Sequence, residues 1–320
     1  MLIVQKFGGS SLADAERMKK AAKICALERK KGHDVIVVVS AMGSRTDELT
    51  ELARSVCTFP KSRETDALLA TGEQCSAALM AMTLEEMGEN AASYTGFQAG
   101  IMTDDGFGNA RAEYIAPGRL ETALSQGIVP VVCGFQGISA GGDITTLGRG
   151  GSDTTAVILA AALGAEKCRI YTDVDGIYTA DPRIVPDARR LDRIDYADML
   201  LLSRSGAGVL HAGSVEIAMA NGVDVELSGT DTPERYTSVC AVRDSDRPEI
   251  AGIGILPEEG TVSAVGRGVG AQTLSEAVLC LSRNGIAVLD GGIEEGRVYV
   301  RTARDRVKIT ANTLHKLLIG

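Results

Sequence analysis

Apolar and polar positions follow two alternating patterns along the first 230 residues. Short runs such as "DVIVVVS" (34–40) are almost continuously apolar, as is typical of strands in a parallel sheet that is covered on both faces. Between these runs, apolar residues recur every third or fourth position, which indicates helices. The predicted strands are 2–7, 34–40, 128–135, 167–174 and 223–229. The predicted helices are 12–30, 64–88, 119–127, 152–165 and 214–222. This alternation predicts a three-layer αβα sandwich with a largely parallel sheet.

The helix over 152–165 carries end signals in its sequence. Ser152 or Asp153 is expected to cap its first turn, because short polar side chains accept hydrogen bonds from free helical N–H groups. Gly164 is expected to end it, because glycine adopts the left-handed conformation that often follows a helix.

The tail of the chain has a different, more compact pattern. A strand at 261–266 is followed by a helix at 274–285, strands at 286–291 and 297–303, and a helix at 306–318. Strand–helix–strand–strand–helix in so few residues predicts a small ferredoxin-like module. We therefore predict two domains, residues 1–245 and 246–320.

Composition excludes several classes of function. A net charge of −9 argues against a surface for nucleic acid or anionic membranes. No apolar run is long enough to span a bilayer, and "MLIVQKFGG" lacks the pattern of a signal peptide. The seven cysteines form no CxxC pair, which favours reduced thiols and a cytoplasmic location. The three histidines are too scattered for a histidine metal site, and no protein-bound metal centre is predicted.

Three glycine-bearing turns fall at strand ends or before helices: "KFGGSS" (6–11), "GFQG" (134–137) and "GRGGSD" (148–153). Glycines let backbone N–H groups approach an anion, and a helix N-terminus adds positive potential. Taken singly, Lys6 and Arg149 are compatible with solvated side chains, and Asp153 with a helix cap. Together the three turns favour a phosphate site. Neither a GxxxxGK[ST] loop nor a GxGxxG fingerprint is present.

The order of these motifs resembles that of the aspartate kinases of the amino acid kinase superfamily. The resemblance runs from residue 2 to about 230 and rests on the segments "KFGGSS", "VVVSAMGSRTDEL", "TGEQCSA", "GFQG", "TTLGRGGSDTTA" and "YTDVDGIYTADPRIVPDA". It implies phosphorylation of the β-carboxylate of L-aspartate by ATP and Mg²⁺, the first step of lysine, threonine and methionine biosynthesis. A carboxylate is already ionised, so such a transfer needs positioning and charge neutralisation rather than a strong base.

The resemblance also assigns roles to residues. Lys6 and Asp153 match the catalytic positions, and Arg149 matches the arginine that holds a substrate carboxylate. Other matches to the aspartate-binding positions are Thr46, Glu73, Phe135 and Ser152, with Glu73 facing the substrate ammonium. Matches to the ATP-binding positions, besides Lys6, are Gly8, Gly9, Ser10, Thr172, Asp173, Tyr178 and Arg183. Without the resemblance, Glu73 reads as an exposed helix residue and Asp181-Pro182 as a simple turn.

The chain departs from the family pattern at two places. Gly208 replaces a lysine that reaches the nucleotide phosphates, and Lys6, Arg183, Mg²⁺ or Arg204 would have to compensate. The tail has room for one ACT-like module rather than two, so we expect a homodimer that pairs through it. These departures keep two alternatives open: an impaired paralogue that acts as a sensor or regulatory subunit, and a kinase of another small amino acid.

Overall fold

The computed structural model describes residues 1–320, which fold into two compact units. The first unit comprises Met1–Asp175 and Ala220–Tyr236, and the second comprises Gly176–Met219 and Thr237–Gly320. The predicted division at 245/246 stays a prediction, since the compact units divide the chain at other positions. No helix combines the length and the apolar composition needed to cross a membrane.

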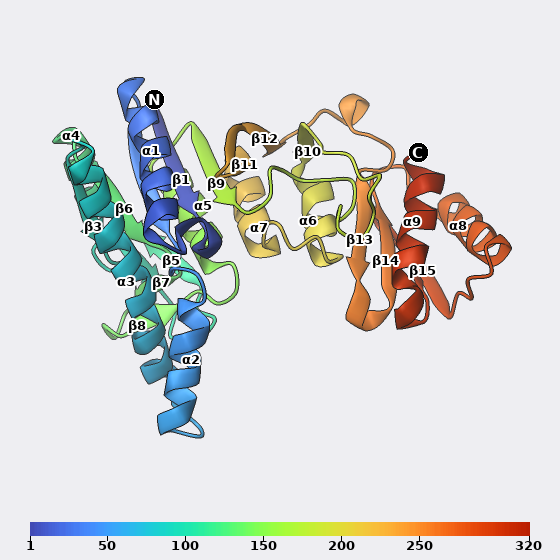
Figure 1. The fold of residues 1–320 in the computed structure, drawn as a ribbon, viewed down its shortest axis with the longest axis horizontal. Coiled ribbons are helices and arrows are strands. Elements are labelled where there is room, and N and C mark those ends of the chain that lie inside the picture. Colours follow the sequence, from blue (N-terminus) through green and yellow to red (C-terminus); the bar gives the residue numbers. More distant parts are fainter. The chain divides into compact units, whose positions relative to one another are not determined.

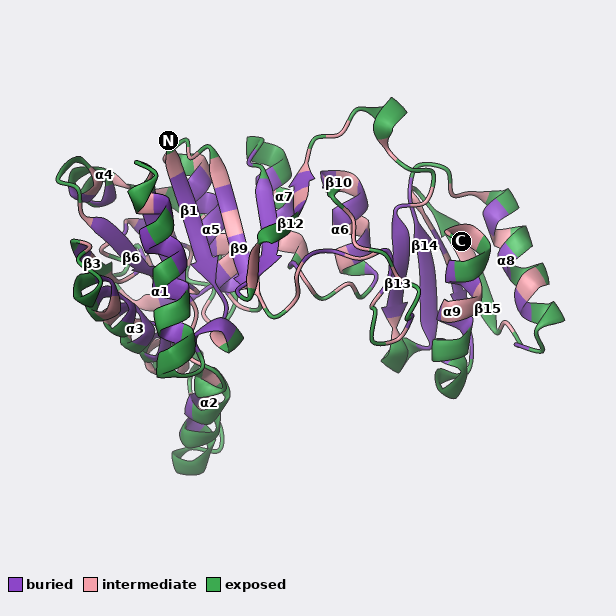
Figure 2. Ribbon diagram, turned by 45° about the horizontal axis from the view of Figure 1, so that its top comes forward, coloured by how far each residue is buried: buried purple, intermediate pink, exposed green.

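The first unit is built on a largely parallel sheet with the order β12-β11-β9-β1-β2-β6-β3. Its strands are β1 (Leu2–Phe7), β2 (Asp34–Val39), β3 (Ala91–Tyr94), β6 (Val129–Cys133), β9 (Lys167–Thr172), β11 (Val225–Gly229) and β12 (Thr232–Cys240). Strands β1, β2, β6, β9 and β11 confirm the five strands predicted from apolar runs. Figure 2 shows that the central strand β1 is largely buried, as expected for a sheet covered on both faces.

Helices cover both faces of this sheet (Figure 1). The helices that contact its strands are α1 (Ala15–Lys30), α3 (Ser62–Glu86), α4 (Gly118–Ser125) and α5 (Gly151–Ala162), whereas α2 (Arg45–Val56) packs on α3. α7 (Ala212–Asn221) lies mostly in the second unit, and only its last residues belong to the first. Phe7 shares one core with α1 and α3. Its neighbour Lys6 must point to the opposite face, and there it meets Asp153 of α5. The αβα sandwich is therefore confirmed.

A second, smaller sheet in the first unit has the order β5-β4-β7-β8. Its strands are β4 (Ile101–Thr103), β5 (Ala112–Ile115), β7 (Gln136–Ser139) and β8 (Ile144–Thr146). None of these strands was predicted, because each has only three or four residues and no clear alternation. This sheet leads the chain into the "GRGGSD" turn directly after β8.

Of the two predicted end signals of α5, the one at its C-terminus is confirmed and the one at its N-terminus is wrong. Gly164 has φ +59° and follows the helix, as expected. Neither Ser152 nor Asp153 is the cap, because both already lie within the helix. The cap position is Gly150, which has φ +72°.

The second unit contains a four-stranded antiparallel sheet with the order β13-β14-β16-β15. Its elements are β13 (Gly252–Leu256), β14 (Thr261–Val265), α8 (Ala271–Arg283), β15 (Asp290–Glu294), β16 (Arg297–Arg301) and α9 (Val307–Leu318). Helices α8 and α9 pack on one face around Ile253, Ile255 and Leu281. The ferredoxin-like pattern is confirmed, with two differences. β13 was not predicted, and β15 starts four residues later than expected.

The remaining elements of the second unit are β10 (Arg193–Asp195), which pairs with the end of β12, and α6 (Tyr196–Arg204). Gly252 and Gly254 of β13 face α6. A Cβ atom on Gly252 would meet Leu202, and one on Gly254 would meet Ser205 at the end of this helix. α6 therefore packs on the face of the antiparallel sheet that is opposite the α8–α9 core.

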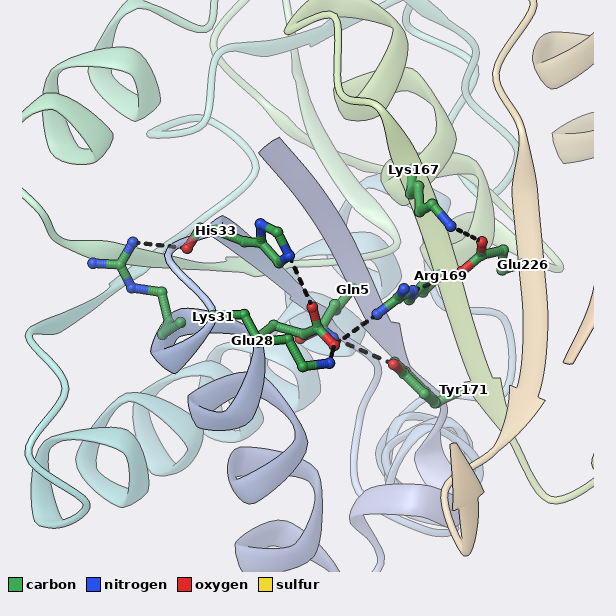
Figure 3. A network of polar contacts seen from close by, with 9 residues as sticks. Gln5, Glu28, Lys31, His33, Lys167, Arg169, Tyr171 and Glu226 are labelled. Atoms are coloured by element: carbon green, nitrogen blue, oxygen red, sulfur yellow. Dashed lines mark hydrogen bonds and ion pairs between the residues drawn. The ribbon is translucent and has the colours of Figure 1, made fainter. Parts of the chain in front are cut away.

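A network of ion pairs around two buried glutamates, Glu28 and Glu226, joins α1 to β9 and β11 (Figure 3). The Arg169 guanidinium lies 3.0 Å from Glu28 Oε1 and 2.7 Å from Glu226 Oε2. Lys31 Nζ contacts the same oxygen of Glu28 at 2.7 Å, and Lys167 pairs with Glu226. Burial opposes the charged form of Glu28, but the hydrogen bond from Lys31 and the charge of Arg169 outweigh it and hold the pKa of Glu28 below its ordinary value.

Candidate functional site

A cleft of about 350 Å³ at the carboxyl edge of the parallel sheet gathers most of the predicted site. It is lined by Lys6, Gly9, Ser40, Ala41, Gly43, Thr46, Glu73, Phe135 and the segment Gly148–Asp153. Every predicted catalytic and aspartate-binding residue lies in this lining. Ser40, Ala41 and Gly43, from the "SAMG" stretch after β2, also line the cleft, although no individual role was predicted for them.

Lys6 and Asp153 form the charged centre of the cleft. Lys6 Nζ lies 2.6 Å from Asp153 Oδ1, and the two side chains are only 10% and 13% exposed. Lys6 is near the end of β1, and Asp153 is in the first turn of α5, so the ion pair fixes the strand end against the helix N-terminus. A buried ammonium is costly without a partner, and Asp153 offsets that cost.

The turn after Lys6 depends on a close approach of two backbone segments. Gly8 N–H donates to the Tyr171 carbonyl, and Gly43 N–H donates to the Gly9 carbonyl. A Cβ atom on Gly9 would lie 2.6 Å from the Ala41 carbonyl oxygen, so only glycine fits there. The segment continues as a short 3-10 helix, Gly9–Leu12, rather than leading straight into α1.

Glu73 brings a second carboxylate to the cleft from α3. Its side chain is buried, and its Oε1 accepts a hydrogen bond from Ala41 N–H at 3.0 Å. Its Oε2 is buried without a partner. Burial raises the pKa of Glu73 to about 7, although the Ala41 hydrogen bond acts in the opposite direction. An unpartnered buried carboxylate oxygen is suited to a ligand cation, and the expectation of an exposed Glu73 is wrong.

Arg149 is the free cation of the cleft. It is exposed, and its guanidinium makes no hydrogen bond or ion pair within the chain. It lies in the turn between β8 and α5, in which Gly148 and Gly150 have φ +70° and +72°. A planar fork without an internal partner is suited to a ligand carboxylate.

Phe135 lines the cleft in a strained backbone conformation. It has φ +70° and is the only non-glycine residue with a positive φ. Its N–H donates to Thr155 Oγ1 and its carbonyl accepts from Leu147 N–H, so both neighbours hold the strained residue in place. Strain of this kind costs about 1–3 kcal/mol and is concentrated at functional sites.

The predicted ATP-binding residues are divided between the two units. Gly8, Gly9 and Ser10 follow β1, whereas Thr172 and Asp173 lie at the end of the neighbouring strand β9. Tyr178 and Arg183 belong to the second unit. There Asp181 accepts hydrogen bonds from the Arg183 N–H at 2.9 Å and from its guanidinium, which confirms the turn predicted at Asp181-Pro182.

The segment around Tyr178 and Arg183 is tied to the last helix, α9. Thr179 Oγ1 lies 2.8 Å from His315 Nε2, and Asn312 Nδ2 donates to the Ile184 carbonyl at 2.9 Å. Arg189 donates to the Ile319 carbonyl. Within the second unit, the predicted nucleotide segment thus packs on the C-terminal module.

Gly208, which replaces the family lysine, lies on an exposed stretch of the second unit. A Cβ atom at this position would meet nothing within 4 Å, so the local packing does not require glycine. Arg204, considered as a substitute cation, pairs with Glu216.

A larger hollow of about 600 Å³ lies elsewhere, between the end of β3 and α4. Its one charged residue, Arg119, stacks on Tyr94 at 5.8 Å from the ring centre. It gathers none of the charged groups of the cleft, so the smaller cleft is the better candidate site.

Comparisons with known proteins agree with this geometry. Residues 1–227 match the model of the amino acid kinase family. An aspartokinase of Mycobacterium tuberculosis is 49% identical over 83% of the chain, and the chain spans 64% of that relative's length. Aspartokinase 2 of Bacillus subtilis is 47% identical over 90% of the chain and is covered over 71% of its own length.

A solved structure shares the fold as well. E. coli aspartokinase III in complex with aspartate and ADP superposes with a TM-score of 0.73 at 26% identity, over 95% of this chain and 79% of that one. The family-model match and the identity to relatives therefore place this chain in the amino acid kinase family and, within it, among the aspartokinases.

Proposed function

We propose that the chain transfers the terminal phosphoryl group of ATP to the β-carboxylate of L-aspartate, giving 4-phospho-L-aspartate and ADP. The observation that supports this most directly is that one cleft brings together Lys6, Glu73, Arg149 and Asp153 from three separate segments of the chain. The names of the similar proteins support the same substrates.

The charges of the cleft suit an amino-dicarboxylic acid. Arg149 would bind the carboxylate that does not react, and the open oxygen of Glu73 would receive the ammonium. With both ends held, the second carboxylate is left to attack phosphorus. It is ionised at neutral pH, so no base is required, and catalysis rests on positioning.

Lys6 and the N-terminus of α5 supply positive charge where the transferred phosphoryl group would pass. Asp153 holds the Lys6 ammonium in place. The roles of Gly8, Gly9, Ser10, Thr172, Asp173, Tyr178 and Arg183 in nucleotide binding, and of Thr46, Phe135 and Ser152 in aspartate binding, are part of this proposal.

Mg²⁺ fits this site as a partner of the nucleotide. The chain has no group of three metal-binding side chains, and Mg²⁺ typically binds through substrate phosphates with one or two carboxylates. Asp153 is the carboxylate beside Lys6 that could face it. The ion would neutralise phosphate charge during transfer.

The test is a coupled assay of ADP release with L-aspartate, L-glutamate and succinate as acceptors. We expect turnover with L-aspartate only, since succinate lacks the ammonium for Glu73 and L-glutamate is longer by one methylene. Equal turnover with succinate would contradict the role of Glu73. Turnover with L-glutamate alone would make the chain a kinase of another amino acid.

A further inference from the structure

Asp66 is a buried carboxylate on α3 that the proposed mechanism does not use. It is 1% exposed and has no ion-pair partner. Its Oδ2 accepts hydrogen bonds from Gly108 N–H at 2.9 Å and Thr146 N–H at 2.8 Å, and its Oδ1 accepts from Thr146 Oγ1 at 2.9 Å. Burying a carboxylate without a cation is costly, so these three bonds must be strong enough to hold it there.

The bonds of Asp66 converge on the strand that leads to Arg149. Thr146 ends β8 three residues before Arg149, and its carbonyl accepts from Ala110 N–H at 2.8 Å. The next residue, Leu147, donates its N–H to the Phe135 carbonyl at 2.8 Å. The backbone that enters the turn is therefore fixed on both sides.

The loop that Asp66 holds also packs against the turn itself. A Cβ atom on Gly148 would lie 2.4 Å from Asn109 Oδ1, so the 108–110 loop is in direct contact with the residue before Arg149. Asp66 thus fixes both the strand end and the loop beside the turn. Arg149 makes no bond of its own within the chain, so the position of its guanidinium depends on this backbone.

Asp66 and Glu73 lie seven residues apart on α3, which puts them on the same face of the helix. Glu73 binds the Ala41 turn with one oxygen and leaves the other open. Both oxygens of Asp66 are taken by the protein. Glu73 can therefore contact a ligand directly, whereas Asp66 can act only through the segments that it holds.

We propose that Asp66 is the positioning residue for Arg149: it clamps Thr146 and Gly108 so that the turn presents the guanidinium to the substrate carboxylate. This inference rests on the proposed function for its substrate. It assigns to Asp66 an effect on aspartate binding rather than on the nucleotide.

The test compares Asp66→Ala with Asp66→Asn. Asp66→Ala is expected to raise the KM for aspartate tenfold or more, with the KM for ATP changed less than twofold. Asp66→Asn keeps an oxygen for the two backbone N–H groups, so its KM for aspartate should rise less than threefold. In an Arg149→Ala background, Asp66→Ala should add no further rise, because both changes remove the same contact. Equal effects on both substrates, or additive effects with Arg149→Ala, would overturn the proposal.

Hydrogen exchange gives a readout that does not depend on activity. Asp66→Ala should speed amide exchange in peptides covering 106–110 and 144–151, with α1 unchanged, whereas Asp66→Asn should change it less. If Asp66→Ala does not fold, Thr146→Val, which removes only the hydroxyl bond, replaces it in both measurements. Wild-type protein without turnover on aspartate would overturn the proposed function, and unchanged exchange at 144–151 would separately overturn the positioning role.

Discussion

Lys6 Nζ and Asp153 Oδ1 lie 2.6 Å apart in a cleft where both side chains are nearly buried. The pair joins a strand end to a helix N-terminus and places one ammonium where a phosphoryl group would be transferred. Lys6→Ala should lower kcat by about a hundredfold or more, with the KM for aspartate changed less than threefold. Steady-state kinetics measure this. Lys19→Ala, which removes an exposed lysine paired with Glu16, is the control and should leave kcat unchanged.

Substitution of Arg149 should change a different kinetic parameter from substitution of Lys6. Arg149→Ala should raise the KM for aspartate at least tenfold and change kcat less, because the guanidinium binds the substrate in the ground state and the transition state alike. Arg149→Lys should lie between wild type and alanine, since lysine keeps the charge without the planar fork. A fall in kcat with an unchanged KM would contradict the assigned role.

Glu73 should make aspartate binding pH-dependent. Its pKa of about 7 in the free protein means that the ionised form, which pairs with an ammonium, is lost as pH falls through 7. The KM for aspartate should therefore rise several-fold between pH 8 and pH 6. Glu73→Gln should bind aspartate weakly at every pH and show no such dependence. A wild-type profile that is flat over this range would exclude the role.

The same group should affect stability with a defined sign. A carboxyl pKa that rises from 4.5 to about 7 on folding favours the protonated folded state, so its contribution is present below pH 4.5 and lost as pH rises to 7. At pH 8 the buried charge costs about 3 kcal/mol, by about 1.4 kcal/mol for each pKa unit. Glu73→Gln should thus be more stable than wild type at pH 8 in urea unfolding, although it binds aspartate poorly.

Gly208 allows a gain-of-function test. Its surroundings leave open space for a side chain. The resemblance to the family predicts that a lysine at this position would contact the nucleotide phosphates. Gly208→Lys should lower the KM for ATP about tenfold, as expected for one charged hydrogen bond worth about 1–3 kcal/mol. Gly208→Ala is the matched control and should leave the KM for ATP unchanged. If Gly208→Ala and Gly208→Lys have the same KM for ATP, the missing cation is not what limits ATP binding.

Arg169 should be important for stability. Arg169→Ala removes the guanidinium that faces both buried carboxylates, Glu28 and Glu226, and should lower the free energy of unfolding by about 3 kcal/mol. Lys31→Ala removes a partner that is 62% exposed, so it should cost less than about 1 kcal/mol. Urea denaturation of the two variants measures both losses of stability. Equal losses of stability would mean that the partly buried position of Arg169 adds nothing to its contribution.

The sandwich was predictable because its central strands are continuous apolar runs, such as Asp34–Val39, and its helices keep a regular apolar spacing. Elements with weaker patterns were missed. β13 has the sequence "GIGIL", in which glycines replace the outward side chains so that α6 can pack closely. The strands of the small sheet are too short to show any period.

The site was predictable to the extent that its glycine turns and their order identify a family. The Lys6–Asp153 contact could not be predicted from the sequence, because it depends on how α5 packs against β1. For the same reason, the prediction that Asp153 caps the helix was wrong. Asp66 carried no local signal, because an acidic residue early in a helix is ordinary. Its role depends on Thr146, eighty residues away in the sequence.

The most direct measurement is to trap the product. Incubating the protein with L-aspartate, ATP, Mg²⁺ and hydroxylamine should convert 4-phospho-L-aspartate to the β-hydroxamate of aspartate, detected by mass spectrometry, and Lys6→Ala should form little or none. No β-hydroxamate from the folded wild-type protein at saturating substrates would contradict the account.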